Sequence, residues 1–383
     1  MAERITGVNW QRIAWCCADR RMSSEALALA TSISETTFDL LQKGHDALTF
    51  PQLQKVANYF GRGVLFFLEP GPASADAVFS TGFRTLANQK YEMEGAVRKI
   101  IERAEWQREA YIELRAEAGD EAIAAFSPPD FSDLSIAEAA SAARIWLGTD
   151  RANSFEAYRQ SVEQKGILVF RTNGYNGKWQ IPKASSILGF SIYHKDLPLI
   201  VVRKTAFESR QTFTLFHELA HILLHKESVI DDESDFESHT KKEKEANAFA
   251  SLILVPEGRL NLVDARQLPP HPWQLDEYLS AYRRRWGVST EVLLLRLLDS
   301  ERIGRDVYDG YRAWRSTQPA DESPAAPRMY RYREPKNILG DGYVRTVLSA
   351  LEDRRITLTR ASKFLDGLKV NDLHKLGEHY ASH

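Results

Sequence analysis

The residues best suited to chemistry in this chain are two histidines four positions apart. His217 and His221 enclose Glu218 in a His-Glu-Leu-Ala-His run. On a helix, side chains four residues apart lie on one face about 5–6 Å from each other, which suits two imidazoles that bind one Zn²⁺. The glutamate between them can then reach a water at the metal. The run has many apolar neighbours, so we predict a buried helix; the alternative is two core histidines bonded to backbone carbonyls.

A catalytic zinc site needs a third protein ligand, and the next helix offers two carboxylates. Glu243 lies on the same helical face as Asn247, whereas Glu245 lies on a different face. We predict Glu243 as the ligand and keep Glu245 as the alternative. Thr240 and Glu243 also fit a helix capping box, which would instead occupy Glu243 locally. Asn247 is predicted to hold the second nitrogen of a zinc-bound imidazole.

Two helices are predicted to position these side chains, over residues 209–225 and 241–254. Strands are predicted over three short apolar segments, residues 166–170, 187–193 and 199–203. A small sheet beside paired helices indicates an α+β fold, and the chain as a whole is predominantly helical.

At these residues the chain resembles the ImmA/IrrE family of metallopeptidase-like proteins. The similarity is closest over residues 189–192, 199–202, 213–221 and 243–256, and it extends more loosely over 135–300. The resemblance implies a zincin-like domain with His217, His221 and Glu243 as zinc ligands and Glu218 as general base. It implies peptide hydrolysis by a zinc-activated water whose proton Glu218 takes. The peptide is expected to lie along a sheet edge formed by residues 187–193.

The first 72 residues are predicted to form a five-helix-type domain. A helix over 24–31, a turn at 32–33 and a second helix over 35–44 have helix-turn-helix spacing. This pattern resembles XRE-type, phage-repressor-like domains. The inward side chains are predicted to be Leu27, Ile33, Phe38 and Leu41. The candidate DNA-facing side chains are Glu35, Thr36, Thr37, Asp39, Gln42 and Lys43.

The charge of this first domain leaves its role open. Residues 1–70 carry seven Lys and Arg and seven Asp and Glu. Contacts with DNA phosphates need basic groups, and in this domain the basic groups do not exceed the acids. Operator binding, which would favour a homodimer, and a module for dimerisation or partner docking both remain as hypotheses.

Composition bounds the remaining choices. The chain has 383 residues and a formal net charge of −2, which excludes binding of nucleic acid by overall charge. No apolar run approaches the roughly 18 residues of a membrane span, so we expect a cytoplasmic protein without membrane contact. Cys16 and Cys17 are adjacent and cannot form a structural zinc site, so any metal must be bound by histidines and carboxylates.

The length favours two or three domains with connecting segments. The predicted divisions are a helix-turn-helix domain at 1–72, a helical connector at 73–134, the metallopeptidase-like domain at 135–300, a helix and linker at 301–340, and a C-terminal helical tail at 341–383. The tail is amphipathic around residues 356–365 and is expected to pack on this chain or on a partner.

The resemblance implies a regulatory protein of prophage, stress or toxin-antitoxin control. In the first hypothesis it is a zinc endopeptidase that cleaves or binds a repressor or toxin partner. In the second it is a non-catalytic antitoxin and transcriptional autoregulator that neutralises a PIN-like toxin, and its zinc site is structural or sensory. Glu218 favours the first hypothesis, because a purely structural site needs no base.

Overall fold

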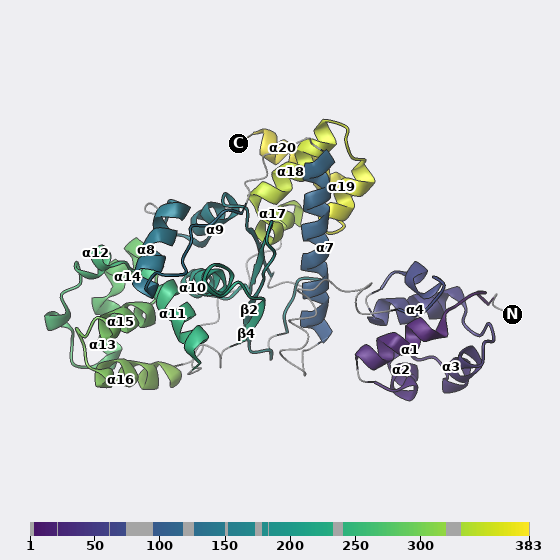
Figure 1. Ribbon diagram of the computed structural model, residues 1–383, viewed down its shortest axis with the longest axis horizontal. Helices are drawn as coiled ribbons and strands as arrows, with labels where there is room; N and C mark the ends of the chain where they lie inside the picture. The colour runs from purple at the N-terminus through teal and green to yellow at the C-terminus, as the bar shows by residue number, and fades with distance from the viewer. Residues whose placement is uncertain are drawn as a thin grey trace. The chain divides into compact units, whose positions relative to one another are not determined.

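The computed structural model divides the chain into two compact units, residues 1–84 and 85–383 (Figure 1). The described residues are 4–20, 22–60, 62–73, 95–117, 126–149, 152–172, 178–182, 184–232, 240–318 and 331–382. Residues 319–330 of the predicted helix and linker at 301–340, and residues 74–94 and 118–125 of the predicted connector, lie outside these ranges.

The N-terminal unit is helical throughout its described elements. These are α1 (Trp10–Asp19), α2 (Ser24–Thr31), α3 (Glu35–Gln42), α4 (Phe50–Phe60) and the 3₁₀ turn η1 (Val64–Phe67). The Ser23 side chain caps α2, and Ser32 adopts a left-handed conformation that ends it. The predicted helix at 24–31 is confirmed, and the second predicted helix ends earlier, at Gln42. The predicted inward residues Leu27, Ile33, Phe38 and Leu41 are all buried.

A four-stranded mixed sheet lies in the described part of the C-terminal unit. Its strands are β1 (Leu168–Arg171), β2 (Ile187–Ile192), β3 (Leu199–Val202) and β4 (Val229–Asp232). Their order across the sheet is β1-β3-β2-β4. β1 is parallel to β3, and β2 is antiparallel to both β3 and β4. The three predicted strands are confirmed, and β4 is a strand that the sequence analysis did not predict.

The position of β4 corrects the prediction that residues 187–193 form an open edge for a peptide. β2 lies inside the sheet, because β3 pairs with one side of it and β4 with the other. Its backbone hydrogen-bonding groups are therefore used within the sheet. Among the described strands, β4 is the outer strand on this side of the sheet. Its four residues run directly into acidic sequence, which is typical of a loop and hides the strand from pattern analysis.

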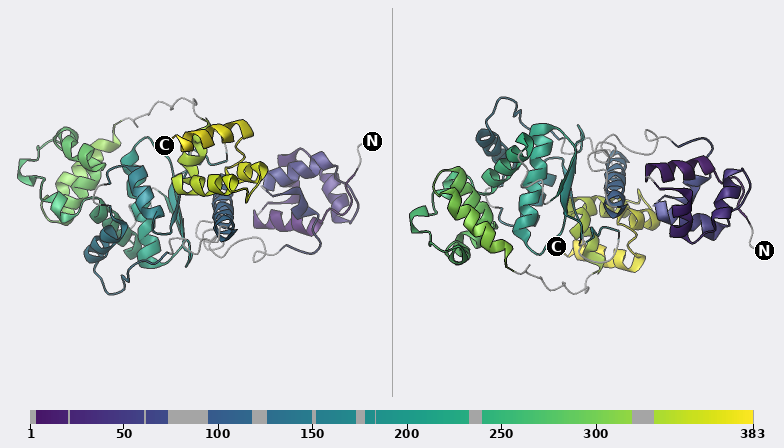
Figure 2. Two further views of the ribbon diagram at one scale, coloured as in Figure 1. Left: turned by 90° about the horizontal axis from the view of Figure 1, so that it is seen from above. Right: turned by 90° about the horizontal axis from the view of Figure 1, so that it is seen from below.

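Helices cover both faces of the sheet. On one face, Val169, Ile200 and Val202 belong to the hydrophobic core that includes α10 (Glu208–Ala220) and α11 (Lys241–Leu254). On the other face, Phe170 packs edge to face against Trp179 and Tyr343. Figures 1 and 2 show the sheet between the α10 and α11 pair and the C-terminal helices. The metal-ligand candidates on α10 and α11 thus lie on one side of the sheet.

The other helices frame these layers. Earlier in the chain than the first strand come α7 (Gly95–Glu117), α8 (Ile136–Leu147) and α9 (Phe155–Glu163). After α11 come α12 (Glu257–Leu260), η4 (Ala265–Gln267), α13 (Pro272–Tyr278), α14 (Ser280–Trp286), α15 (Thr290–Asp299) and α16 (Arg305–Ser316). The last elements are η5 (Arg331–Arg333), α17 (Glu334–Leu339), α18 (Asp341–Glu352), α19 (Leu358–Phe364) and α20 (Val370–Ala381).

The C-terminal tail packs on this chain. Tyr343 of α18 donates a hydrogen bond to Gln107 of α7, and both side chains are buried. Phe364 of α19 lies 5.9 Å from Trp106 of α7, measured between ring centroids. Arg360 of α19 also pairs with carboxylates of α7. The amphipathic face of the tail is therefore used within the C-terminal unit, which decides between the two alternatives left open by its sequence.

Candidate metal centre

The first part of the centre is a buried helix. His217 and Glu218 are fully buried on α10, and His221, which is 1% exposed, follows directly after its end. Beyond Ala220 the backbone winds more widely, as a π-helix over His221–His225. Such π segments are rare and occur often at functional sites. The prediction of one helix over 209–225 is thus confirmed in outline, with a change of winding at its end.

The second part is α11, which packs closely against α10. Ala246 and Ala250 are fully buried, and small side chains let two helices approach closely. The Thr240 hydroxyl accepts a hydrogen bond from the backbone N–H of Glu243, which caps the helix. The Glu243 carboxylate, however, points to His217 and His221 and does not complete a capping box. The cap and the site therefore use different parts of the same short segment.

His217, His221 and Glu243 converge on one point. The Nε2 atoms of the two histidines lie 3.2 Å apart. Glu243 Oε2 lies 3.1 Å from Nε2 of His217 and 3.7 Å from Nε2 of His221. The structure thus brings together the three side chains predicted as metal ligands, contributed by two neighbouring helices.

Asp231 is a fourth member of this cluster and was missed by the sequence analysis. It lies on β4, is fully buried, and places Oδ2 3.2 Å from His217 Nε2 and 3.6 Å from His221 Nε2. One ligand atom from each of the four side chains lies within 4.8 Å of the others. The only sequence signal was a pair of apolar residues, Val229 and Ile230, ahead of an acid in an acidic stretch.

Asn247 fixes the orientation of His217. Its Oδ1 atom lies 3.0 Å from His217 Nδ1, and an amide oxygen can only accept a hydrogen bond. Nδ1 of His217 therefore carries a proton, which leaves the lone pair of Nε2 directed into the cluster when the ring is neutral. Asn247 thus contacts the second nitrogen of a histidine that is predicted to bind the metal.

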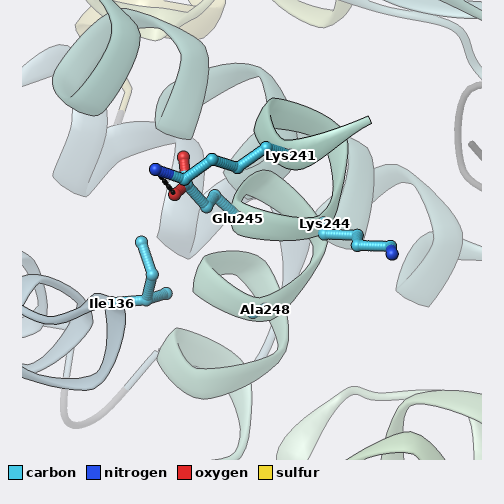
Figure 3. Close-up of a pocket in the computed structure, with 5 residues that line it drawn as sticks. All are labelled: Ile136, Lys241, Lys244, Glu245 and Ala248. Carbon is cyan, nitrogen blue, oxygen red and sulfur yellow. Dashed lines mark ion pairs between the residues drawn. The ribbon is translucent and has the colours of Figure 1, made fainter. Parts of the chain in front are cut away.

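Glu245, the alternative ligand, lies outside the cluster and fixes the second imidazole indirectly. Its Oε2 atom is 3.2 Å from Nε2 of His225, and Nδ1 of His225 is 3.0 Å from Nδ1 of His221. A carboxylate accepts only, so Nε2 of a neutral His225 donates to it and Nδ1 accepts from His221. This leaves the Nε2 lone pair of His221 directed into the cluster. Glu245 also pairs with Lys241 at the wall of a surface pocket (Figure 3).

The cluster is electrostatically unusual for a protein interior. Burial lowers the pKa of His217, but the neighbouring Asp231 and Glu243 outweigh this effect and raise it to about 9. Burial alone would raise the pKa of Glu243, yet the two imidazoles lower it to about 2. Burial raises the pKa of Glu218 well above its usual range, and the carboxylate of Asp231 raises it further. The group therefore favours a positive charge at its centre.

A divalent metal ion fits this environment. With their Nδ1 protons committed outside the cluster, both rings would offer their Nε2 lone pairs, together with the two carboxylates, to one bound cation. Without a metal the same carboxylates favour a proton on His217, as its raised pKa indicates. Within the described chain, both oxygens of the buried Asp231 lack a regular hydrogen bond. Two imidazoles and two carboxylates are ligands that Zn²⁺ accepts in proteins, although other divalent ions also bind such sets.

A family comparison agrees with this geometry. Residues 162–298 match the model of the IrrE N-terminal-like domain, Peptidase_M78. The match begins in α9, includes the whole sheet and all four members of the cluster, and ends in α15. No curated protein matches the chain at a significant level. The IrrE N-terminal-like domain thus contains the buried His217, His221, Asp231 and Glu243 cluster, as expected of a metallopeptidase.

The matched residues do not include the N-terminal unit or the C-terminal tail. In the N-terminal unit, α3 exposes Glu35, Thr36, Asp39 and Gln42, with Thr37 half-buried and Lys43 exposed just after the helix. These candidate DNA-facing residues lie on one short helix, and Thr37 also bonds to the hydroxyl of Ser34.

Among the described residues, none of the helices is long and apolar enough to cross a membrane.

Proposed function

We propose that the IrrE N-terminal-like domain is a zinc-dependent endopeptidase. The observation that carries the proposal is the convergence of His217, His221 and Glu243, with the buried Glu218 between the two histidines in the sequence. A site of two imidazoles and one carboxylate holds zinc and leaves a position for water in hydrolytic enzymes.

The residues of this chain have separate roles in the proposed reaction. Zinc would supply the activation of a water molecule and the polarisation of a peptide carbonyl. Glu218 accepts the proton of the attacking water and later transfers it to the leaving amine. Burial and the carboxylate of Asp231 raise its pKa, which favours its uptake of that proton. Asn247 and the His225–Glu245 pair hold the imidazoles in the required orientation.

Glu218→Gln tests the peptidase proposal. Glutamine keeps the size of the side chain but cannot take a proton, so zinc content should be unchanged while cleavage falls about 10²–10⁴-fold. His217→Ala should lose both zinc and cleavage. Equal cleavage by Glu218→Gln and the wild type would contradict the assignment of this residue.

A second candidate function is supported by Asp231. Structural zinc sites have four protein ligands, whereas catalytic sites keep one position open. A fourth buried carboxylate beside the histidines favours a metal that is structural or sensory. In this alternative the chain is a cytoplasmic antitoxin that binds a PIN-like toxin. Co-purification with the product of a neighbouring gene distinguishes the two: a cut partner supports the peptidase, and an intact, tightly bound partner supports the antitoxin.

For the N-terminal unit we propose a helix-turn-helix that binds operator DNA as a homodimer and thereby places the domain in a regulatory protein of prophage, stress or toxin-antitoxin control. α2 and α3 are joined at the left-handed Ser32, and α3 exposes polar side chains. A mobility shift with the DNA upstream of its own gene should weaken steeply as salt rises. Absence of any shift at low salt would favour partner docking instead.

A further inference from the structure

Asp231 differs from the other members of the metal cluster in its place in the fold. His217, His221 and Glu243 lie on or directly after two packed helices, whereas Asp231 lies on an outer strand of the sheet. On β4 it is paired in register with Gly189 of β2. Its side chain shares the face of Gly189, which is the face covered by Glu218 and Thr214 of α10. The strand therefore presents this carboxylate to the histidines.

The position of Asp231 matches that of Glu243. Oδ2 of Asp231 lies 3.2 and 3.6 Å from the two histidine Nε2 atoms, and Oε2 of Glu243 lies 3.1 and 3.7 Å from them. An ion held between the imidazoles is thus equally within reach of both carboxylates. Asp231 is fully buried and neither of its oxygens makes a hydrogen bond of regular geometry in the described chain, so its charge is balanced by the neighbouring histidines, a role that a bound cation would take.

We propose that Asp231 is a fourth, protein-supplied metal ligand that keeps the centre closed. Four protein ligands complete a tetrahedral zinc site and exclude the water that hydrolysis needs. In this conformation the domain binds metal but is latent. This inference rests on the proposed function in one respect: the reaction that the closed site prevents is taken to be peptide hydrolysis.

The fold provides a way to withdraw this ligand. Among the described strands, β4 pairs with β2 alone, and its register with β2 shifts between Ile187 and Gly189, next to the partner of Asp231. Register irregularities of this kind occur at sheet edges and next to active sites. An extended peptide that pairs with β2 in place of the end of β4 would remove Asp231 and open one position at the metal.

The closed site is tested with the full chain loaded with Co²⁺, whose visible spectrum reports coordination. Thiocyanate is added as a probe of an open position, and metal affinity is measured by chelator competition. We expect thiocyanate to leave the wild-type spectrum unchanged and to shift that of Asp231→Ala. We also expect Asp231→Ala to bind metal at least about tenfold more weakly. The control is Glu227→Ala, which removes an exposed carboxylate paired with Lys242.

The outcomes separate this inference from the peptidase proposal. A wild-type spectrum that shifts with thiocyanate as much as that of Asp231→Ala would overturn the closed site, as would equal metal affinities. Asp231→Asn, which is nearly isosteric, provides the same comparison if the alanine variant does not fold. Faster cleavage of casein by Asp231→Ala than by the wild type supports release of a latent peptidase. No cleavage by either protein, with the expected spectra, would overturn the peptidase and leave the closed site supported.

Discussion

Gly189 of β2 and Glu218 of α10 lie so close that a side chain at position 189 has no room. A Cβ at this position would be 2.6 Å from Glu218 Oε1 and 2.8 Å from Thr214 Cγ2. The absence of a side chain on the strand is therefore what allows the carboxylate of the proposed base to lie between helix and sheet. This contact links a strand residue directly to the chemistry of the helix.

Gly189→Ala should displace Glu218 or separate α10 from the sheet. Overpacking of this kind typically costs about 1–3 kcal/mol of unfolding free energy. We expect a lower melting temperature and a larger loss of peptidase activity than of zinc binding, because the added Cβ meets Glu218 and Thr214 rather than a histidine. The control is Gly258→Ala on α12, where a Cβ meets no atom within 4 Å. Equal melting temperatures for the two variants would contradict the close packing of Gly189.

Asn247→Ala should weaken zinc binding without removing a ligand. It removes the oxygen that accepts a hydrogen bond from Nδ1 of His217. The ring can then carry its proton on Nε2, the nitrogen that would bind the metal. Loss of such outer partners typically costs about 10–100-fold in metal affinity, which chelator competition measures. Lys244→Ala, at an exposed position on the same helix, is the control. Unchanged affinity in Asn247→Ala would show that the ring is oriented by other means.

Glu245→Gln should also lower metal affinity, through His225 and His221. A glutamine side chain can donate a hydrogen bond to Nε2 of His225. Nδ1 of His225 can then donate to Nδ1 of His221, which reverses the direction of both hydrogen bonds. We expect a loss of about tenfold, measured in the same competition. Lys241→Ala removes only the exposed ion pair with Glu245 and should have little effect. An equal loss in both variants would point to a general disturbance of the helix rather than to the hydrogen bonds of His225 and His221.

Glu163 predicts a pH dependence of stability in the C-terminal unit. Burial raises its pKa from 4.5 to about 7, although Arg159 opposes the shift. The folded state therefore holds this proton more tightly than the unfolded state. The resulting stabilisation is fully present below pH 4.5 and is lost as the pH rises through about 7.

Melting temperatures between pH 5 and 8 measure this effect. Glu163→Gln should flatten the decrease in stability across this range, because glutamine does not titrate. Glu156→Gln, on the same helix and half exposed, should keep the wild-type slope. If all three proteins show the same slope, Glu163 does not hold the proton in the folded state.

Local sequence patterns were sufficient for the helical part of the site. The four-residue spacing of His217 and His221, and the shared face of Glu243 and Asn247, depend only on helical geometry. The structure places these side chains together as the spacing requires. The role of Glu245 was ambiguous because the sequence alone does not show that His225 lies close enough to form a hydrogen bond with it. His225 ends the π-helical segment, which sequence patterns do not predict.

Non-local pairing explains what the sequence could not predict. Asp231 reaches the histidines only because Val229–Asp232 pairs with β2, and strand pairing is not encoded by the four residues themselves. For the same reason residues 187–193 were predicted as an open edge. The packing of the tail on α7 also depends on residues far apart in the chain, such as Gln107 and Tyr343.

The central claim is that a metal ion binds where His217, His221 and Glu243 meet. Its most direct test is the zinc content of the purified full chain, measured by inductively coupled plasma mass spectrometry. We predict about one zinc per wild-type chain and almost none in a His217→Ala/His221→Ala double variant. A wild-type protein without metal after zinc supplementation, or a double variant with the same content, would contradict the account.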